Sequence, residues 1–370
     1  MPARAPQARA DRGPRPDGHA RPPLRRSRRE LLARPGRRRA LTAPGRPFPP
    51  HGSSRAEHKE ISHVSPKLSV VIPTRDRPRS LAESLSSLAG QGLGDAMEVV
   101  VVNDGGELVD EVVAPFRDRL DVKLIGYPKG AGPSTARNAA IEAISGEYLA
   151  FLDDDDVLLP KHFRSTLEVL DTTDADLVYT TTMVSTTRAP VGMTHESGGW
   201  PAFDIPFDAD FLHVTNFIPP VGVTMRSPKE RGARFDPELL VVEDWDFWLT
   251  LADKFSYRFA HLDRATGVYH RLPRYDQAPD PPAETARVLR MFYDSHVAQF
   301  SRWPLPAGSR AKSSREYVRH TYELALARLG RGDMLPAYWY ERMVRLVHGE
   351  YVGDVPTGEI HDRLDQAMNG

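Results

Sequence analysis

EYLAFLDDDDVLLP (residues 147–160) combines an apolar run with four consecutive aspartates. The run Tyr148 to Leu152 predicts a buried strand, and Asp153 to Asp156 follow where that strand should end. Four adjacent like charges repel one another and cannot be buried without a counter-charge. The usual solution is a divalent cation that bridges a phosphate-bearing ligand, and open α/β sheets bind ligands at the carboxyl ends of their strands. The alternative is a solvated acidic turn that caps the next helix.

Strands and helices alternate on either side of this stretch. Continuous apolar runs predict buried strands, and proline and glycine mark where helices begin and end. The expected strands are Leu68–Thr74, Met97–Asp104, Asp121–Tyr127, Tyr148–Leu152 and Asp176–Thr180, and the expected helices are Pro78–Leu88, 107–119, 133–146 and one from about Pro160. This alternation predicts an α/β fold with a mostly parallel central sheet and helices on both faces.

The second half of the chain is less regular. Residues 181–240 hold many Pro, Gly, Thr and aromatic residues, as binding loops often do, and only Val221–Met225 is strand-like. Leu239–Phe255 has helical spacing, and Phe259–His270 predicts a short hairpin or pair of strands. Amphipathic helices are expected near 284–300, 313–329 and 334–348.

Composition limits the class of protein. The chain has 370 residues and no cysteine, so any metal must be held by Asp, Glu, His or main-chain oxygen. No apolar run approaches the roughly 18 residues that a membrane helix needs. We therefore expect a cytoplasmic protein, with peripheral contact at the inner face of the membrane as an alternative.

The formal net charge of −1 hides an uneven distribution. Residues 1–60 carry 16 Lys and Arg against 5 Asp and Glu, and they are rich in Pro, Gly and Ala. This composition predicts a disordered basic tail over residues 1–64. An arm for anionic lipid or nucleic acid is one interpretation. We favour a solvated tail, or a misassigned start codon with the true start at Val64.

Two motifs suggest a nucleotide site. Asp104 lies in NDGG after the second expected strand, where a carboxylate can accept a hydrogen bond from uracil or thymine N3–H. An ordinary Asp-Gly turn is the alternative. Arg137 lies in GPSTARN at the start of a helix, and both an arginine and a helix N-terminus favour phosphate. A solvent-facing arginine is an equally good interpretation.

Two further motifs suggest catalysis and metal binding. Glu243 and Asp244 lie in VVEDWDFW, and a carboxylate beside aromatic rings is partly desolvated, which suits a general base. Taken alone, an acidic pair at a helix N-terminus is the simpler interpretation. His270 lies in GVYHR, and a neutral imidazole can bind Mn²⁺, although a lone histidine is more often structural.

Together these strings are more specific than any one of them. LSVVIPTRDRP, EVVVVNDGG, GPSTARNAAIEAISGEYLAFLDDDDVLLP and FDPELLVVEDWDFWLTLA occur in an order and at spacings that resemble family 2 glycosyltransferases, over about residues 67–272. The resemblance implies a GT-A fold, in which a Rossmann-like nucleotide half joins an acceptor half. It also implies an inverting transferase that uses a nucleotide-diphosphate sugar and Mg²⁺ or Mn²⁺.

The resemblance assigns roles to individual residues. It makes Asp104 the base-reading carboxylate and Asp244 the general base, and it aligns Asp156 with the aspartate that follows the DxD pair. The donor residues would be Pro73, Thr74, Arg75, Asp104, Arg137, Asp153, Asp154 and Asp155. The DxD pair, Asp153 and Asp155, would bind the metal. The position of His270 is a metal or phosphate ligand in some relatives, and this assignment is the loosest.

The acceptor side is less determined. We expect contributions from Trp200, Asn216, Glu243 and Trp245. A UDP-sugar is the favoured donor and a dTDP-sugar the next, because Asp104 would read either pyrimidine. A cell-surface glycan, a lipid-linked intermediate and a specialised metabolite are all compatible acceptors. Gln299, Arg302 and Trp303 form a QxxRW, which resembles a motif of processive synthases. We interpret it as packing or coincidence and expect a non-processive enzyme.

These motifs predict the domain organisation. A GT-A domain spans 65–275, with a nucleotide-sugar half at 65–180 and an acceptor half at 181–275. A helical extension follows at 282–352 and a tail at 353–370; the extension would cover the acceptor side or mediate a homodimer. Two rival functions are a sugar nucleotidyltransferase and a non-catalytic protein that binds a nucleotide sugar or a partner.

Overall fold

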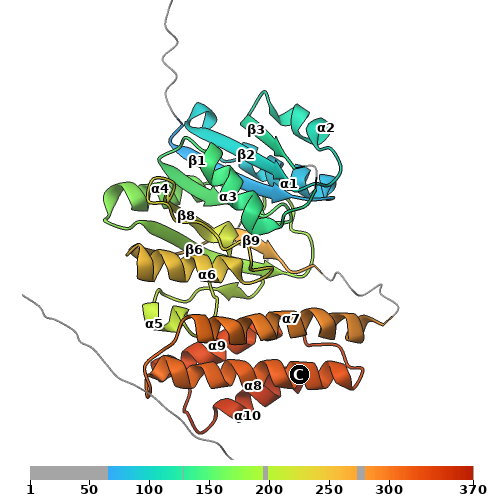
Figure 1. The fold of residues 1–370 in the computed structure, drawn as a ribbon, viewed down its shortest axis with the longest axis vertical. Coiled ribbons are helices and arrows are strands. Elements are labelled where there is room, and N and C mark those ends of the chain that lie inside the picture. The colour runs from blue at the N-terminus through green and yellow to red at the C-terminus, as the bar shows by residue number, and fades with distance from the viewer. Residues whose placement is uncertain (1–65, 128, 195–198, 273–279, 370) are drawn as a thin grey trace, which may run out of the picture. The chain divides into compact units, whose positions relative to one another are not determined.

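The central sheet begins as four parallel strands. The computed structural model describes residues 66–127, 129–194, 199–272 and 280–369. Strands β1 (Leu68–Thr74), β2 (Met97–Asn103), β3 (Asp121–Gly126) and β4 (Tyr148–Phe151) lie in the order β3-β2-β1-β4, and all neighbours are parallel (Figure 1). Every residue of β2 is buried, as the continuous apolar run predicts for a sheet covered on both faces.

Helices cover both faces of this sheet. Alternate residues of β1 point to opposite sides: Val70 packs in the cluster that includes α1 (Pro78–Ala89), and Val71 packs in the cluster that includes α3 (Pro133–Ala143). The first of these faces also carries α2 (Asp110–Val113) and α4 (His162–Thr172). The predicted α/β architecture is confirmed, and the short turns Gly94–Ala96 and Ala114–Phe116 complete this half.

Beyond β4 the sheet becomes mixed. Strand β8 (Val223–Arg226) runs antiparallel to β4 and to β6 (Leu177–Ser185), and β6 runs parallel to β9 (Phe259–His270). The short strands β5 (Val157–Leu158) and β7 (Ala202–Phe203) pair with β9 and β6, respectively. The sheet therefore continues from the nucleotide half into the acceptor half without a break.

The predicted hairpin at Phe259–His270 is wrong. The segment is one strand of 12 residues, β9, paired with β6 along its length. The polar pair Asp263 and Arg264 resembles a turn in the sequence. In the structure both residues are exposed at a register shift, between the residues that pair with Thr180 and Thr181. An irregularity in the strand thus accommodates the polar residues that the prediction placed in a turn.

Helices α7 (Pro281–Arg302), α8 (Arg310–Gly330), α9 (Trp339–Val352) and α10 (Ile360–Asn369) form a group below α6 (Glu243–Leu249) in Figure 1. The core of this group is continuous with one face of the sheet. The short helix α5 (Ala209–Leu212) contacts α9 through Phe211, the turn Pro220–Gly222 precedes β8, and a π-helical segment (Thr250–Lys254) continues α6. Among the described residues, no helix is long and apolar enough to cross a membrane.

Two predictions about the ends of the chain have different outcomes. The prediction of a tail at 353–370 is wrong for α10, which buries Ile360, Leu364 and Met368 against its neighbours. Their four-residue spacing was the available signal for a helix. The predicted tail at 1–64 lies outside the described residues.

The QxxRW residues lie at the C-terminal end of α7, where it contacts α6. Trp303 donates from Nε1 to Asp246 Oδ1 at 2.9 Å, and Arg302 forms an ion pair with the same carboxylate at 2.8 Å. Gln299 is buried in the same region. This geometry agrees with the packing interpretation, because the motif attaches the end of α7 to the helix that carries Asp244.

Candidate active site

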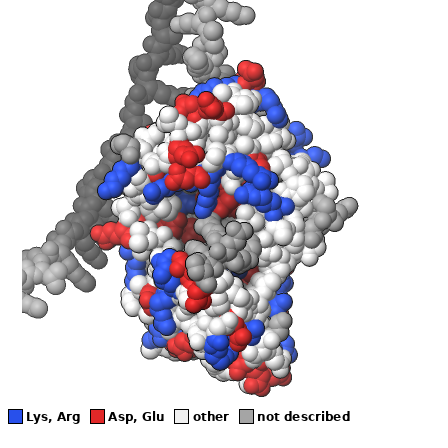
Figure 2. Space-filling model, turned by 90° about the vertical axis from the view of Figure 1, so that its right-hand side faces the viewer, with Lys and Arg blue, Asp and Glu red and all other residues white. Residues whose placement is uncertain are grey.

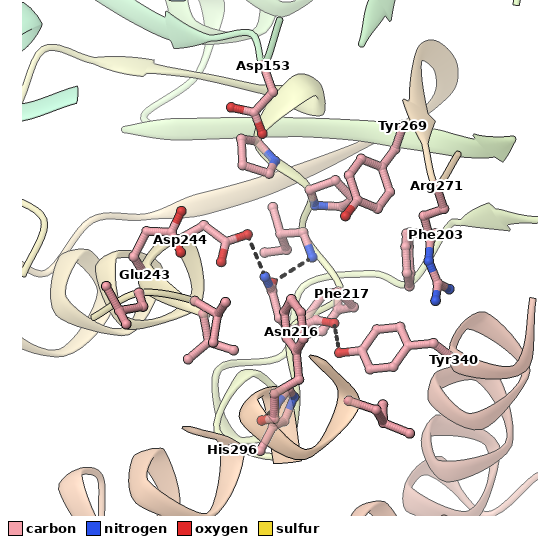
Figure 3. A pocket seen from close by; sticks show the side chains of 18 of the residues that line it. Asp153, Phe203, Asn216, Phe217, Glu243, Asp244, Tyr269, Arg271, His296 and Tyr340 are labelled. Atoms are coloured by element: carbon pink, nitrogen blue, oxygen red, sulfur yellow. Dashed lines mark hydrogen bonds between the residues drawn. The ribbon is translucent and has the colours of Figure 1, made fainter. Parts of the chain in front are cut away.

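A pocket of about 380 Å³ opens beside Asp153 and the N-terminus of α6. Segments far apart in the sequence form its walls, as Figure 3 shows. From the sheet half of the chain the lining residues are Arg137, Asp153, Phe203, residues 216–220 and 240–244, Tyr269 and Arg271. From the C-terminal helices they are Leu289, Phe292, His296, Tyr322, Trp339 and Tyr340. The helical extension is therefore part of the site.

The four aspartates divide by burial. Asp154 and Asp156 are 4% and 0% exposed, whereas Asp153 and Asp155 keep partial access to solvent. Asp154 accepts hydrogen bonds from Thr74 Oγ1 at 2.7 Å and from Arg77 at 2.9 Å. Arg77 also donates to Asp155 at 2.9 Å. Burial raises the pKa of Asp154, and Arg77 opposes this rise. Sequence analysis missed Arg77, although it lies in the quoted PTRDRP.

Asp156 is buried and contacts the backbone of β9. Its Oδ1 accepts the backbone N–H of His270 at 2.8 Å, and its Oδ2 has no partner within the described ranges. Burial, together with the neighbouring carboxylates, raises the pKa of Asp156 well above its usual value. The hydroxyl of Ser84 on α1 donates to the main-chain oxygens of Asp154 and Asp156, at 2.9 and 2.7 Å. These contacts fix the turn that presents Asp153 and Asp155.

Arg137 joins two acidic motifs. Its guanidinium is 3% exposed and donates to Asp153 at 2.6 Å and to Glu243 at 2.7 Å. It also lies over the ring of Phe235, 5.5 Å from the centroid. The predicted phosphate contact would thus have to form beside two carboxylates that already bind this arginine. What the structure establishes is an ionic link between the ends of β4 and α6.

Asp104 lies at the end of β2, facing the loop before α3. Its two carboxylate oxygens accept the backbone N–H groups of Ala131 and Gly132, at 2.7 and 2.9 Å. A carboxylate has about four lone-pair positions, so further acceptor capacity remains. Asn103 fixes the adjacent turn by bonding Gly106 N–H and the Glu107 carbonyl.

The segment after β1 borders the same loop. Pro73 is partly exposed, Arg75 is 58% exposed along its side chain, and its guanidinium lies against Gly130. A side chain at position 130 would collide with Arg75 and with the main chain of Asp104. The Arg75 guanidinium and the main chain of Asp104 therefore both lie next to Gly130.

The structure does not support His270 as a metal ligand. Its Nδ1 donates to the main-chain oxygen of Asp155, and its Nε2 accepts the N–H of Ala189 at 2.9 Å. Both ring nitrogens are thus occupied, and burial lowers the pKa of His270. The histidine instead supports the turn of the aspartate run. The local string GVYHR contained no sign of these partners, since both are distant in sequence.

The remaining acidic pair, Asp153 and Asp155, fits a metal ion that also binds the substrate. Within the described part of the chain, no group of three His, Asp or Glu side chains could hold an ion. Asp153 and Asp155 are the partly exposed carboxylates of the run. Mg²⁺ commonly binds one or two carboxylates and completes its shell with water and substrate phosphate. The donor set therefore fits a cation that arrives with a diphosphate.

Asp244 lines the pocket at the N-terminus of α6. Its Oδ2 accepts from Asn216 Nδ2 at 2.8 Å (Figure 3), and its Oδ1 accepts from the N–H of Trp245 at 2.8 Å. Burial raises the pKa of Asp244 to about 7; the Glu243 carboxylate also raises it, and Arg137 lowers it. Val242, directly before the pair, has a φ of 58°, a strained value for a β-branched residue.

Asn216 positions Asp244. Its Oδ1 accepts the N–H of Ile218 at 3.1 Å, which leaves Nδ2 directed at the carboxylate. Its main-chain oxygen accepts from Tyr340 Oη at 3.0 Å (Figure 3). Asn216 was predicted as an acceptor residue, and it does line the pocket, with a clear second role as the partner of Asp244.

Helix α9 contributes residues that sequence analysis missed. Tyr340 and Trp339 follow Tyr338, which has a left-handed φ of 59°. Arg271, at the end of β9, donates to both carboxylate oxygens of Glu341 at 2.7 and 2.8 Å. Because these residues lie outside the motifs, only their contacts with the Asn216 loop and β9 reveal them.

His296 on α7 is a further pocket residue without a signal in the sequence. It is 3% exposed, and its Nδ1 donates to the main-chain oxygen of Phe292 at 3.0 Å. Its Nε2 has no partner in the parts of the chain that are described. Burial lowers the pKa of His296 to about 4, so the imidazole is neutral at physiological pH.

Two predicted acceptor residues lie elsewhere. Trp245 is fully buried and donates from Nε1 to the main-chain oxygen of Leu212 at 2.7 Å. Trp200 packs against a separate apolar cluster that includes Met183 and Val268. Neither belongs to the pocket lining. Glu243, the fourth prediction, lines the pocket and holds Arg137.

The surface charge is mixed in sign. Figure 2 shows one face on which basic and acidic side chains lie beside one another around a recess.

Comparison with known proteins shows the family and the fold. A family model described as Glycosyl transferase family 2 matches residues 69–236. The uncharacterized glycosyltransferase YwdF of Bacillus subtilis is 30% identical over 238 residues, which cover 62% of this chain and 84% of that protein. The uncharacterized glycosyltransferase EpsJ of the same organism is 26% identical, over 71% of this chain and 78% of that protein.

A solved structure shows the same fold. The mannosyltransferase PcManGT from Pyrobaculum calidifontis, in complex with GDP-Man and Mn²⁺, is 15% identical and matches with a TM-score of 0.51. The match covers 82% of this chain and 85% of that chain. The shared architecture is the GT-A fold. From the matched family model and the relatives, this chain belongs to the family 2 glycosyltransferases.

Proposed function

We propose that this glycosyltransferase is inverting, metal-dependent and non-processive, with Asp244 as its general base. A UDP-sugar is the favoured donor and a dTDP-sugar the next. The observation that carries the proposal is the environment of Asp244. A carboxylate with a pKa of about 7, held by Asn216 at the edge of a pocket, can accept a proton at neutral pH.

The donor would lie along the carboxyl ends of the parallel strands. Asp104 retains acceptor capacity for the base, and Arg75 borders the same loop. Asp153 and Asp155 would hold Mg²⁺ or Mn²⁺ together with the diphosphate, as hard oxygen ligands do. When bound, the cation would neutralise the charge that develops on the leaving diphosphate. PcManGT, which shares the fold, was solved with a nucleotide sugar and Mn²⁺.

The reaction is a single displacement. Asp244 takes the proton of the acceptor hydroxyl while that oxygen forms a bond to the anomeric carbon. The bond from this carbon to the diphosphate oxygen breaks, and the nucleoside diphosphate leaves with the electron pair. Attack from the opposite side inverts the anomeric centre. Asn216 keeps the carboxylate directed at the hydroxyl, and Arg137 ties the donor side to the base through Asp153 and Glu243.

Calorimetric titration tests the donor side of this proposal. The titrants are UDP, dTDP, GDP and their common sugars, with Mn²⁺, on the wild type and on Asp155→Ala. We expect metal-dependent binding of the uridine nucleotides, weakened about a hundredfold in the variant. Glu238→Gln, at an exposed position before α6, is the control and should bind normally. A folded wild type that binds none of these nucleotides would refute the proposed function.

A further inference from the structure

The walls of the pocket beyond Asp244 are largely apolar. Of the 21 described residues that line it, 14 are aliphatic, aromatic or proline residues. The polar lining residues gather near Asp244, where Arg137, Asp153, Glu243 and Asn216 contact one another or the base. The part formed by α7, α8 and α9 supplies mainly rings and aliphatic side chains, namely Leu289, Phe292, Tyr322, Trp339 and Tyr340.

In this apolar part the Tyr340 hydroxyl and the Arg271 guanidinium already have partners, and His296 Nε2 has none among the described residues. Tyr340 Oη bonds Thr215 Oγ1 at 2.9 Å and the Asn216 carbonyl at 3.0 Å. The Arg271 guanidinium is paired with Glu341. An acceptor with many hydroxyl groups would bury several of them without a partner, and each such hydroxyl would weaken binding. The pocket is therefore a poor site for a free sugar or polyol.

The pocket also reaches the surface through apolar side chains. Leu240 is 74% exposed and Phe292 is 36% exposed, and both line the pocket. Large apolar side chains exposed beside a binding site are common where an apolar ligand enters. Leu240 lies three residues before Glu243, so this apolar edge adjoins the residues that activate the acceptor.

We propose that the acceptor is an alcohol or phenol whose hydroxyl is borne on an apolar body, held between α6, α7 and α9. This inference rests on the proposed function, because it takes Asp244 as the base that receives the hydroxyl proton. The hydroxyl lies at the polar end beside Asp244 and Asn216. The apolar body lies against Phe292, Trp339 and Tyr340, where its burial supplies the binding free energy.

Titration of three probes into the protein saturated with UDP and Mn²⁺ tests this inference. The probes are 4-methylumbelliferone, 1-decanol and methyl β-D-glucopyranoside, each measured at three temperatures. We expect the ring or the chain alcohol to bind with a negative heat-capacity change, the mark of apolar burial, and the glucoside to bind at least tenfold more weakly. A preference between the first two probes distinguishes a ring-bearing from a chain-bearing acceptor.

Paired variants locate the binding site. Phe292→Ser should weaken binding of the apolar probe about tenfold, and the more exposed Leu240→Ser about threefold. Met291→Ser is the matched control: Met291 is 36% exposed like Phe292 and adjacent on α7, but it does not line the pocket. We expect less than a twofold change in Met291→Ser and unchanged UDP binding in all three variants.

The two levels of the proposal fail in different ways. If UDP does not bind to the folded wild type, the proposed function is wrong, and the inference falls with it. If UDP binds but the glucoside binds best, or no apolar probe binds, only the acceptor class is overturned. Apolar binding that Phe292→Ser and Met291→Ser change equally would also overturn it, because the site would then lie elsewhere.

Discussion

The aspartate run at the end of β4 and the Glu243–Asp244 pair at the start of α6 both place carboxylates side by side. They differ in the partners that the fold supplies. In the run, Arg137 contacts Asp153, and Arg77 contacts Asp154 and Asp155. In the pair, Glu243 accepts from the guanidinium of Arg137, whereas Asp244 accepts, among the described residues, only from an amide and a backbone N–H.

This difference in partners suits the two groups of carboxylates to different chemistry, namely cation binding and proton transfer. A carboxylate beside a guanidinium is stabilised in its charged form and suits a role as a cation ligand. A partly buried carboxylate with only neutral donors holds its proton more strongly, and the pKa of Asp244 accordingly rises to about 7. Inside the run, burial and the neighbouring carboxylates likewise raise the pKa of Asp156, whose Oδ1 accepts the backbone N–H of His270. Burial and charged partners together thus set how strongly each carboxylate holds its proton.

The largest expected effect comes from removing the base. Asp244→Asn should lower kcat about 10³-fold, within the usual range for general-base catalysis, because the amide cannot accept the acceptor proton. Binding of UDP and Mn²⁺ should be unchanged, since the donor carboxylates are intact. Steady-state kinetics and calorimetry check the two parts. A kcat within tenfold of wild type would remove Asp244 from the mechanism.

The same variant should be more stable than the wild type. The folded-state pKa of Asp244 lies above that of the unfolded chain, so the native state retains a proton that the unfolded chain releases above about pH 4. The ionised group therefore costs stability at pH 8. Asp244→Asn should raise the free energy of unfolding by about 1–3 kcal/mol, measured in urea. Glu238→Gln should leave it unchanged; a destabilised Asp244→Asn would contradict the comparison.

Asn216→Ala tests how much the amide donor contributes to the behaviour of Asp244. The variant removes the amide donor to Asp244, so the carboxylate loses both orientation and a hydrogen bond to its charged form. We expect kcat to fall about 10-fold to 100-fold and the midpoint of the pH–rate profile to move upward. Asn216→Asp, which cannot donate, should not restore the rate. A lower kcat with an unshifted midpoint would indicate a purely structural role.

The wild-type pH dependence gives a smaller effect. Because Asp244 must be ionised to accept a proton, kcat/KM should rise with pH and level off above about pH 7. Below the midpoint it should fall about tenfold per pH unit. Initial rates between pH 5.5 and 8.5 at constant ionic strength check this. A flat profile over that range would mean that chemistry is not limited by this carboxylate.

The smallest expected effect concerns the aspartate run at the end of β4. Arg77→Gln leaves the buried Asp154 with Thr74 as its remaining side-chain partner and should destabilise the metal-free protein by about 1 kcal/mol. Urea unfolding in EDTA measures this. Arg79→Gln is the control, because Arg79 is 79% exposed along its side chain and pairs with Glu83 on the same helix. An equal loss of unfolding free energy in both variants would show that Arg77 has no specific role in stabilising Asp154.

Much of the fold could be predicted from local sequence. Strands β1 to β4 begin where predicted, and their bounds agree within a residue, since continuous apolar runs bounded by Pro, Gly and Asp leave few alternatives. Strand β9 and helix α10 were mispredicted for a common reason. Polar residues at a register shift resemble a turn, and a short amphipathic segment resembles a tail, unless the elements that they pack against are known.

The sequence by itself determined the family, the order of the motifs and the carboxylates that line the pocket, because these depend on short segments with strong local signals. Only the tertiary structure decided how the side chains are used. It occupied both nitrogens of His270, buried Trp245, and brought Tyr340 from α9 to the Asn216 loop. Such outcomes depend on which distant segments meet, and no local pattern encodes a contact between residues that are far apart in the sequence.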